Sequence, residues 1–171
     1  MDTSSIFDLT YKITFKKQLS YLIQPLSYLL LSLTISYLLF DFTKYFITIP
    51  CLCFVLDVLP ALILHFQYLH KDFKATLTFD RLQNRIAFTK KGKTLFYNFQ
   101  DIYRITKVQS STYGVTNARH SFTNYYYYIF VFNDKSELAI TCLLANDLEI
   151  FLSAIFNSKI ETRFKLFPSI G

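Results

Sequence analysis

The sequence predicts an α+β membrane protein, in which a transmembrane helical hairpin is followed by an antiparallel β domain closed by a C-terminal helix. Two apolar stretches near the N-terminus, 18–40 and 45–70, together contain one formal charge, that of Asp57. From residue 75 onward, apolar residues recur at every second position, which is the period of a half-buried strand. Near residue 150 the apolar spacing changes to that of one helical face.

The first apolar stretch is long enough to cross a membrane. A hydrocarbon core of about 30 Å requires about 20 helical residues, so we expect the first span at about 19–40. Lys12, Lys16 and Lys17 precede it, as they would in a signal peptide. The stretch is too long for a signal core, however, and no small-residue cleavage site follows it.

The second apolar stretch predicts a span at about 46–68, although Pro50, Asp57 and Pro60 interrupt it. Its many Leu, Ile, Val and Phe residues outweigh the roughly 3 kcal/mol that one central Asp adds to the free energy of insertion. Proline is tolerated in membrane helices when neighbouring groups satisfy the freed carbonyls. We therefore expect both stretches to span the membrane as one hairpin.

The flanking charges predict the orientation of the hairpin. Basic residues flank both of its outer ends, whereas the connection at 41–44 carries one charge of each sign. Positive residues favour the cytoplasmic side, so we expect a multi-pass protein of the cytoplasmic membrane with both termini in the cytoplasm. The chain then divides into residues 1–70, the N-terminal segment with the hairpin, and residues 71–171, the cytoplasmic β domain.

Asp57 is the residue whose position most needs an explanation. Polar residues recur every four positions on both predicted helices, and folding the hairpin places Asp57 opposite Tyr28 and Ser32. One interpretation is a hydrogen-bonded carboxyl group that holds two helices together. The other is an ion or proton pathway, because carboxylates within membranes are often functional. A pathway would require an oligomer, because two helices alone enclose none.

The domain after the hairpin is predicted to contain five or six antiparallel strands. Residues 125–132 are apolar or aromatic on both faces, which favours a central strand. A helix at about 147–157 closes the domain, with Asn146 as its cap and Glu149 in the capping-box position. A basic tail follows this helix.

The sequence shows no catalytic or metal-binding constellation. Three glycines leave no Gly-rich phosphate loop, and the three histidines are scattered rather than placed at metal-ligand spacing. We therefore expect a non-enzymatic protein without cofactor, metal or small-molecule substrate. The basic pI of about 9.2 reflects charges near the predicted membrane ends, so we expect no nucleic-acid partner.

The basic residues after the hairpin predict contact with the membrane surface, because each Lys or Arg near an anionic leaflet contributes about 1 kcal/mol. They are Lys71, Lys74, Arg81, Arg85, Lys90, Lys91 and Lys93. Lys71 and Lys74 follow the second span directly and must lie near the membrane. The direction of the turn at 90–93 is left open by the sequence.

Three stretches resemble a known family. They are Leu-Thr-Phe-Asp with Arg-Ile-Ala-Phe (77–80 and 85–88), Tyr-Asn-Phe-Gln-Asp-Ile (97–102) and Ile-Thr-Cys-Leu-Leu (140–144). Together with the hairpin and the closing helix, they resemble bacterial membrane-anchored proteins with a pleckstrin-homology-like (PH-like) domain. The tryptophan that is frequent in the central element of that family is absent here, and no functional residue transfers.

The resemblance implies a two-sheet sandwich or barrel plugged by the C-terminal helix. It also implies an adaptor or regulatory protein whose cytoplasmic domain binds a protein partner or the inner leaflet of the bilayer. A subunit of an oligomeric channel or transporter that uses Asp57 is the alternative. The expected partners are therefore the lipid bilayer and either a protein or further copies of the chain.

Overall fold

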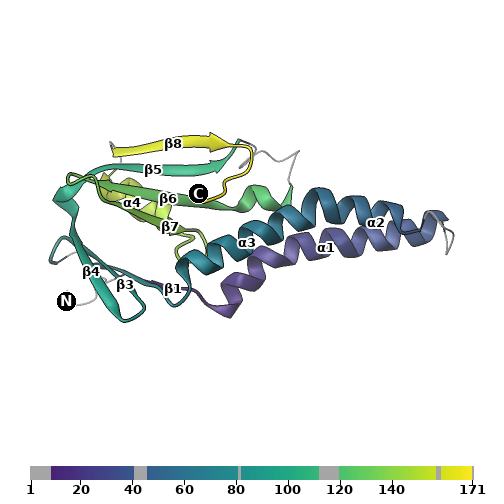
Figure 1. Ribbon diagram of the computed structural model, residues 1–171, viewed down its shortest axis with the longest axis horizontal. Coiled ribbons are helices and arrows are strands. Elements are labelled where there is room, and N and C mark those ends of the chain that lie inside the picture. The colour runs from purple at the N-terminus through teal and green to yellow at the C-terminus, as the bar shows by residue number, and fades with distance from the viewer. Residues whose placement is uncertain (1–8, 41–45, 81, 112–119, 157–158, 171) are drawn as a thin grey trace, which may run out of the picture.

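The computed structural model describes residues 9–40, 46–80, 82–111, 120–156 and 159–170. Two β-sheets and a short helix pack around one end of a helical hairpin, and the other end of the hairpin projects away from them (Figure 1). The predicted α+β class is confirmed, as is the position of the hairpin before most of the strands.

Two antiparallel helical arms form the hairpin. The first arm is α1 (Phe15–Phe40), and the second contains α2 (Thr48–Cys53), the π-helical turn η2 (Phe54–Val58) and α3 (Leu59–Asp72). Both arms are long and apolar enough to cross a membrane by length and composition. The wide turn η2 ends two residues before Pro60, which has no N–H to donate and whose ring crowds the preceding turn.

The first sheet has the strand order β1-β2-β3-β4. Strands β2 (Thr76–Asp80), β3 (Arg85–Lys90) and β4 (Lys93–Asn98) follow the hairpin, where the period of two predicts strands. Strand β1 (Leu9–Lys12) precedes the hairpin and pairs with β2 in antiparallel register. The hairpin is thus inserted between the first two strands of the sheet, whereas the sequence-based division at residue 70 groups β1 with the hairpin.

The second sheet has the order β7-β6-β5-β8. Strand β6 (Tyr126–Phe132) lies between β5 (Ile102–Ser110) and β7 (Glu137–Thr141) and is largely buried, as predicted for the aromatic stretch. The C-terminal tail forms β8 (Ile160–Lys165), which pairs with β5 in parallel. The described residues therefore form eight strands rather than five or six, and the second sheet is mixed rather than purely antiparallel.

The predicted closing helix is present as α4 (Leu148–Phe156). Leu148, Phe151, Leu152 and Phe156 are buried on one of its faces. The Phe151 ring lies 4.5 Å from the Phe79 ring of β2, measured between centroids, so the helix packs on the first sheet. The helix thereby covers the space between the sheets.

The predicted capping box of α4 is not formed. The Asn146 Oδ1 atom is buried and has no hydrogen-bond partner among the described residues. Glu149 instead accepts a hydrogen bond from Lys107 Nζ at 2.7 Å. A long-range ion pair with β5 therefore replaces the local contact that the sequence spacing suggested.

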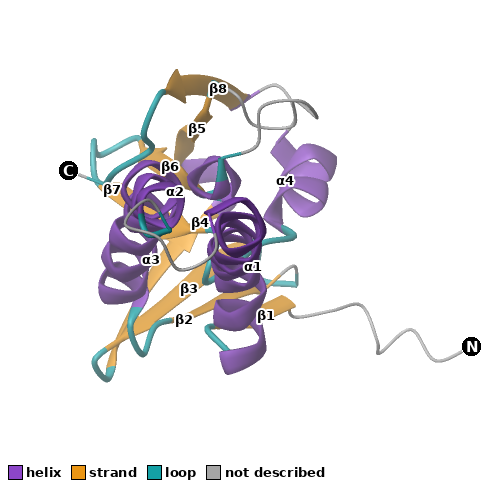
Figure 2. Cartoon of the chain, turned by 90° about the vertical axis from the view of Figure 1, so that its right-hand side faces the viewer, coloured by secondary structure: helices purple, strands orange, loops and turns teal. Residues whose placement is uncertain are grey.

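The hydrophobic core joins the two sheets to the base of the hairpin. Figure 2, which looks along the hairpin, shows the two arms between the strands of the first sheet and those of the second. Leu64 and Tyr68 of α3 belong to the same buried cluster as Leu77 of β2 and Phe130 of β6. The lower part of α3 is therefore a core element of the domain.

Candidate functional site

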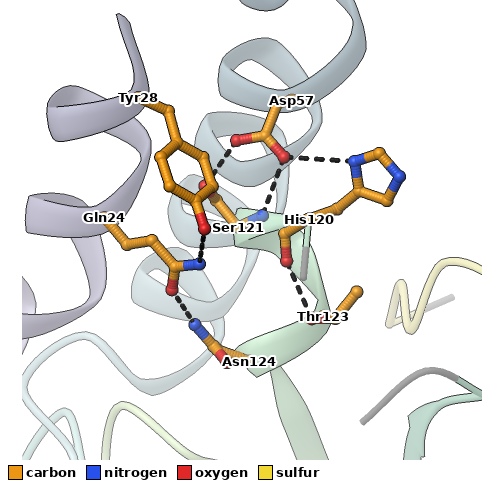
Figure 3. A network of polar contacts seen from close by, with 7 residues as sticks. All are labelled: Gln24, Tyr28, Asp57, His120, Ser121, Thr123 and Asn124. Atoms are coloured by element: carbon orange, nitrogen blue, oxygen red, sulfur yellow. Dashed lines mark hydrogen bonds and ion pairs between the residues drawn. The ribbon is translucent and has the colours of Figure 1, made fainter. Parts of the chain in front are cut away.

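Asp57 binds the β domain rather than the opposite helix. Its carboxylate accepts hydrogen bonds from the Ser121 backbone N–H at 2.8 Å and from the Ser121 hydroxyl at 2.5 Å. The His120 Nδ1 atom lies 3.3 Å from the same carboxylate (Figure 3). Both partners belong to the start of the 3₁₀ turn η4 (Ser121–Asn124), which precedes β6. Both carboxylate oxygens are satisfied, and Asp57 is buried.

Tyr28 and Ser32 lie near Asp57 without bonding to it. All three residues line one cavity of about 320 Å³ between the arms, together with His120. The Tyr28 hydroxyl accepts a hydrogen bond from Gln24 at 3.1 Å, and the Ser32 hydroxyl donates to the Leu29 carbonyl at 2.8 Å. The bonds expected between Asp57 and these two residues are therefore directed to η4 instead, because η4 packs beside both arms.

The turn η4 is bonded to both arms of the hairpin. At its start Ser121 holds Asp57 of the second arm, and at its end the Asn124 amide donates to Gln24 Oε1 of α1 at 2.5 Å. Thr123 donates to the His120 carbonyl at 2.7 Å and closes the turn (Figure 3). This polar network links three segments that lie far apart in the sequence.

Further polar contacts attach the domain to α3 below Asp57. The His65 Nδ1 atom lies 3.1 Å from the Tyr125 hydroxyl, and the Tyr68 hydroxyl donates to the Pro168 carbonyl at 2.7 Å. Burial raises the pKa of the Tyr125 phenol, so that this hydroxyl stays protonated. At the end of the helix, Asp72 accepts from the Thr141 N–H at 2.9 Å. The domain therefore contacts one face of α3 along its length.

A basic cluster lies at the base of the hairpin, where β3 and β4 turn. Lys91 and Gly92 both have positive φ angles, as a two-residue turn of type I′ requires. This turn lies beside the end of α3, and Lys90 Nζ donates to the Lys71 carbonyl. His70, Phe73, Lys74, Lys90 and Lys91 line a pocket of about 300 Å³. Lys93 is paired directly with Lys90 and stands at the same end of the sheet.

Arg85 does not belong to this cluster. It stands at the opposite end of β3, where its Nε atom lies 3.3 Å from Asp80 and its guanidinium lies over the Phe96 ring. Arg81 lies outside the described residues. The structure thus brings Lys71, Lys74, Lys90, Lys91 and Lys93 together at the hairpin base and adds His70, which the sequence reasoning did not select. Because the sequence left the direction of the turn open, it could not indicate this pocket.

The chain was compared with protein-family models, curated proteins and solved structures. A family model described as a PH domain matches residues 10–152, which is most of the chain. The matched range begins in β1 and ends in α4, so that it includes the hairpin, and only β8 lies wholly beyond it. Searches of curated proteins and of solved structures gave no significant match.

Proposed function

The chain belongs to the PH domain family, and we propose that it is a membrane-anchored, non-enzymatic binding module of the bacterial cytoplasmic membrane. In this proposal the hairpin anchors the protein, both termini are cytoplasmic, and the domain presents a binding surface to the inner leaflet. The binding surface is the basic cluster formed by His70, Lys71, Lys74, Lys90, Lys91 and Lys93.

The outward face of the hairpin supports the anchoring. Large apolar side chains remain exposed along both arms, including Leu30, Leu38, Leu52, Leu56 and Phe66. A soluble protein rarely exposes a continuous apolar surface of this kind. Lipid acyl chains would cover it without further protein.

The basic cluster supports binding to the inner leaflet, and it is the observation that carries the proposed function. Four of its residues, His70, Lys74, Lys90 and Lys91, line a concave pocket at the end of the hairpin that is predicted to be cytoplasmic. Phe73 supplies an apolar wall, and the Lys74 ammonium lies 5.4 Å from the centre of its ring. Several ammonium groups beside an apolar wall match the phosphate and glycerol of an anionic lipid headgroup.

Native mass spectrometry of the full chain in detergent tests this binding. Added phosphatidylglycerol should remain bound to the wild-type chain, whereas phosphatidylcholine should not. The double variant Lys90→Gln/Lys91→Gln should retain several-fold less phosphatidylglycerol, because two ammonium groups that line the pocket are lost. Equal retention of the two lipids by the wild-type chain would contradict the proposal.

A charge-matched variant controls for net charge. Arg104 and Lys135 stand at the end of the second sheet that lies away from the hairpin, so Arg104→Gln/Lys135→Gln removes the same charge elsewhere. This control should bind phosphatidylglycerol like the wild-type chain. If it loses as much lipid as the Lys90→Gln/Lys91→Gln variant, the attraction is diffuse and the pocket is not the site.

Cysteine labelling of intact cells tests the proposed orientation. Thr43 lies in the connection between the arms, and Lys135 lies in the turn between β6 and β7. With Cys51 and Cys53 replaced by Ala, an impermeant thiol reagent should modify a Thr43→Cys variant and leave a Lys135→Cys variant unmodified. The opposite labelling pattern would show that the domain lies outside the cell and would contradict the proposed orientation.

The partners of Asp57 support a positioning role over the transport alternative. A carboxylate that accepts two hydrogen bonds from Ser121 holds η4 against the second arm. We assign Asp57 to the attachment of the domain to the hairpin. In this role Asp57→Asn, which keeps one acceptor oxygen, should leave the lipid retention described above unchanged.

A further inference from the structure

The part of the hairpin that extends beyond the domain is shorter than a bilayer. On the second arm, Asp57 contacts η4, and α2 begins at Thr48, about 14 Å further on at about 1.5 Å per residue. On the first arm, Gln24 contacts η4, and α1 ends at Phe40, about 24 Å further on. Both lengths fall below the roughly 30 Å of a hydrocarbon core.

This shortfall leaves two arrangements for an anchored hairpin. Either the connection between the arms stops inside the bilayer, or the domain edge beside the arms enters the inner leaflet. The connection contains Asp41 and Lys44, and ionised side chains near the bilayer centre are strongly unfavourable. We propose that η4 and the segment after β8 lie within the hydrocarbon of the inner leaflet and contact acyl chains, an inference that rests on the proposed anchoring of the hairpin.

The surface of this edge has the composition that lipid contact requires. The arm and the domain form one apolar groove of about 320 Å³, in which the lining side chains include Leu56, Leu59, Ile63, Phe122, Leu166 and Phe167. Leu166 is 76% exposed, although it is large and apolar. The groove continues the apolar outer face of the second arm, so acyl chains that cover the arm also reach Leu166.

The polar groups that join the arms to η4 are paired with one another. Asp57 is bonded to Ser121, and Gln24 is bonded to Asn124, so that the contacts between the arms and η4 expose little unpaired polarity. The Lys165 ammonium lies 3.4 Å from the Tyr127 hydroxyl of β6, a position that turns it back along the sheet. A polar network between the arms and the domain is thus compatible with a surrounding of lipid.

The charged residues at the cytoplasmic ends of the arms agree with the membrane depth proposed for η4. Counting about 30 Å back from Thr48 and Phe40 places the cytoplasmic boundary of the hydrocarbon near Tyr68 and Ser20. The basic cluster, with Lys71 and Lys74, begins only a few residues beyond Tyr68. The cluster therefore stands at the level of the headgroups when η4 stands within the acyl chains.

Tryptophan fluorescence can measure this depth, because the chain contains no native tryptophan. The full chain is reconstituted in phosphatidylcholine–phosphatidylglycerol vesicles as three separate variants. Leu166→Trp reports on the domain edge. Leu52→Trp is the reference in lipid, because Leu52 is 59% exposed on the second arm and does not line the groove.

Tyr103→Trp is the matched control in water. Tyr103 is 67% exposed near the start of β5, about 23 Å from Ser110 at the other end of that strand. Lys165 pairs with Ser110, so Leu166 and Tyr103 stand at opposite ends of one sheet. Lipids brominated on their acyl chains and aqueous acrylamide serve as the two quenchers.

The expected result is that brominated lipid quenches Leu166→Trp about as strongly as Leu52→Trp, while acrylamide quenches only Tyr103→Trp. If Leu166→Trp behaves like Tyr103→Trp while Leu52→Trp stays lipid-quenched, the domain edge lies in water and the inference is overturned. If brominated lipid quenches none of the three, the anchoring itself fails. Phe164→Trp, an aromatic exchange at an exposed position of β8, repeats the test should Leu166→Trp alter the fold.

Discussion

The two halves of the second arm belong to one apolar helical segment but have different surroundings. From Thr48 to Leu56 most large side chains are exposed, and Leu52 is 59% exposed. From Asp57 to Asp72 the arm is bonded to the domain at Asp57, His65, Tyr68 and Asp72, and Leu64 is fully buried. The sequence predicts a single span that includes both halves, whereas the structure leaves the first half exposed and packs one face of the second into the domain core.

A pair of leucine substitutions should separate the two halves most strongly. Leu64→Ala removes a fully buried side chain and should reduce the free energy of unfolding by about 2–5 kcal/mol. Leu52→Ala, at an exposed position of the same arm, should change it by about 0.5 kcal/mol or less. Urea unfolding of both variants in the same detergent, followed by circular dichroism, measures the difference. Equal losses of stability in the two variants would contradict the difference in burial between the halves.

The boundary between the halves depends on Asp57. Asp57→Ala leaves the Ser121 N–H without its acceptor, which should weaken the attachment of η4 by about 1–3 kcal/mol. Hydrogen exchange of the peptide that contains Ser121 should accelerate accordingly. Ser32→Ala is the control, because among the described residues the Ser32 hydroxyl bonds only to the Leu29 carbonyl of its own helix. If both variants exchange like the wild-type chain, Asp57 does not hold the domain.

Loss of a single hydroxyl group in the part of the molecule where the domain covers the hairpin should have a smaller effect on stability. Tyr125→Phe keeps the buried ring but removes the hydrogen bond to His65, and should reduce the stability by about 0.5–1.5 kcal/mol. Tyr103→Phe, in which an exposed hydroxyl is lost, should leave the stability unchanged. Thermal unfolding of the two variants in parallel checks this, and a larger loss for Tyr103→Phe would contradict the assignment.

The reactivity of two native thiols should distinguish the exposed half of the hairpin from the domain core. This prediction involves no change in stability at neutral pH. Burial raises the pKa of the Cys142 thiol from 9.0 to about 12, whereas Cys51 is exposed on the hairpin. At about pH 9 in detergent, maleimide should modify Cys51 and spare Cys142, as read by peptide mass spectrometry. The neutral thiol favours the folded state below pH 9, and this contribution is lost as the pH rises toward about 12. Rapid modification of Cys142 would show that the site opens.

Much of the fold follows from local patterns in the sequence. The arms follow from two apolar stretches, β6 from an aromatic stretch that is apolar on both faces, and α4 from a stripe with helical spacing. Each of these signals lies within one segment, because burial on one or both faces imposes a period that the residues must obey. Leu152 of α4 and Phe130 of β6 are buried as that reasoning expects.

The two missed strands have weak local signals. β1 is only Leu-Thr-Tyr-Lys, and it is stabilised by pairing with residues 76–79 on the other side of the hairpin. β8 is almost entirely exposed and joins the sheet as an edge strand parallel to β5. Neither strand carries the long alternation of buried and exposed residues that identifies a strand by its own sequence.

The hydrogen-bond partners of the candidate site residues were harder to predict from the sequence than the strands. Asp57 binds Ser121, which lies in a polar segment far along the chain, and no spacing rule relates the two residues. The lysines of the basic cluster were recognised as a group, but only the β3–β4 turn decides which of them meet His70. A costly buried carboxylate indicated that a partner exists without indicating which residue it is.

Cross-linking in the membrane tests most directly whether the domain covers the lower half of the hairpin. With Cys51 and Cys53 replaced by Ala, Gln24→Cys/Asn124→Cys places two thiols where the native side chains are hydrogen-bonded at 2.5 Å. Ile35→Cys/Asn124→Cys moves the first thiol about 16 Å along α1 toward the exposed half. A short bis-maleimide should join the first pair within one chain and leave the second pair unjoined, as read by mass spectrometry. Equal cross-linking of the two pairs, or none in either, would contradict the account.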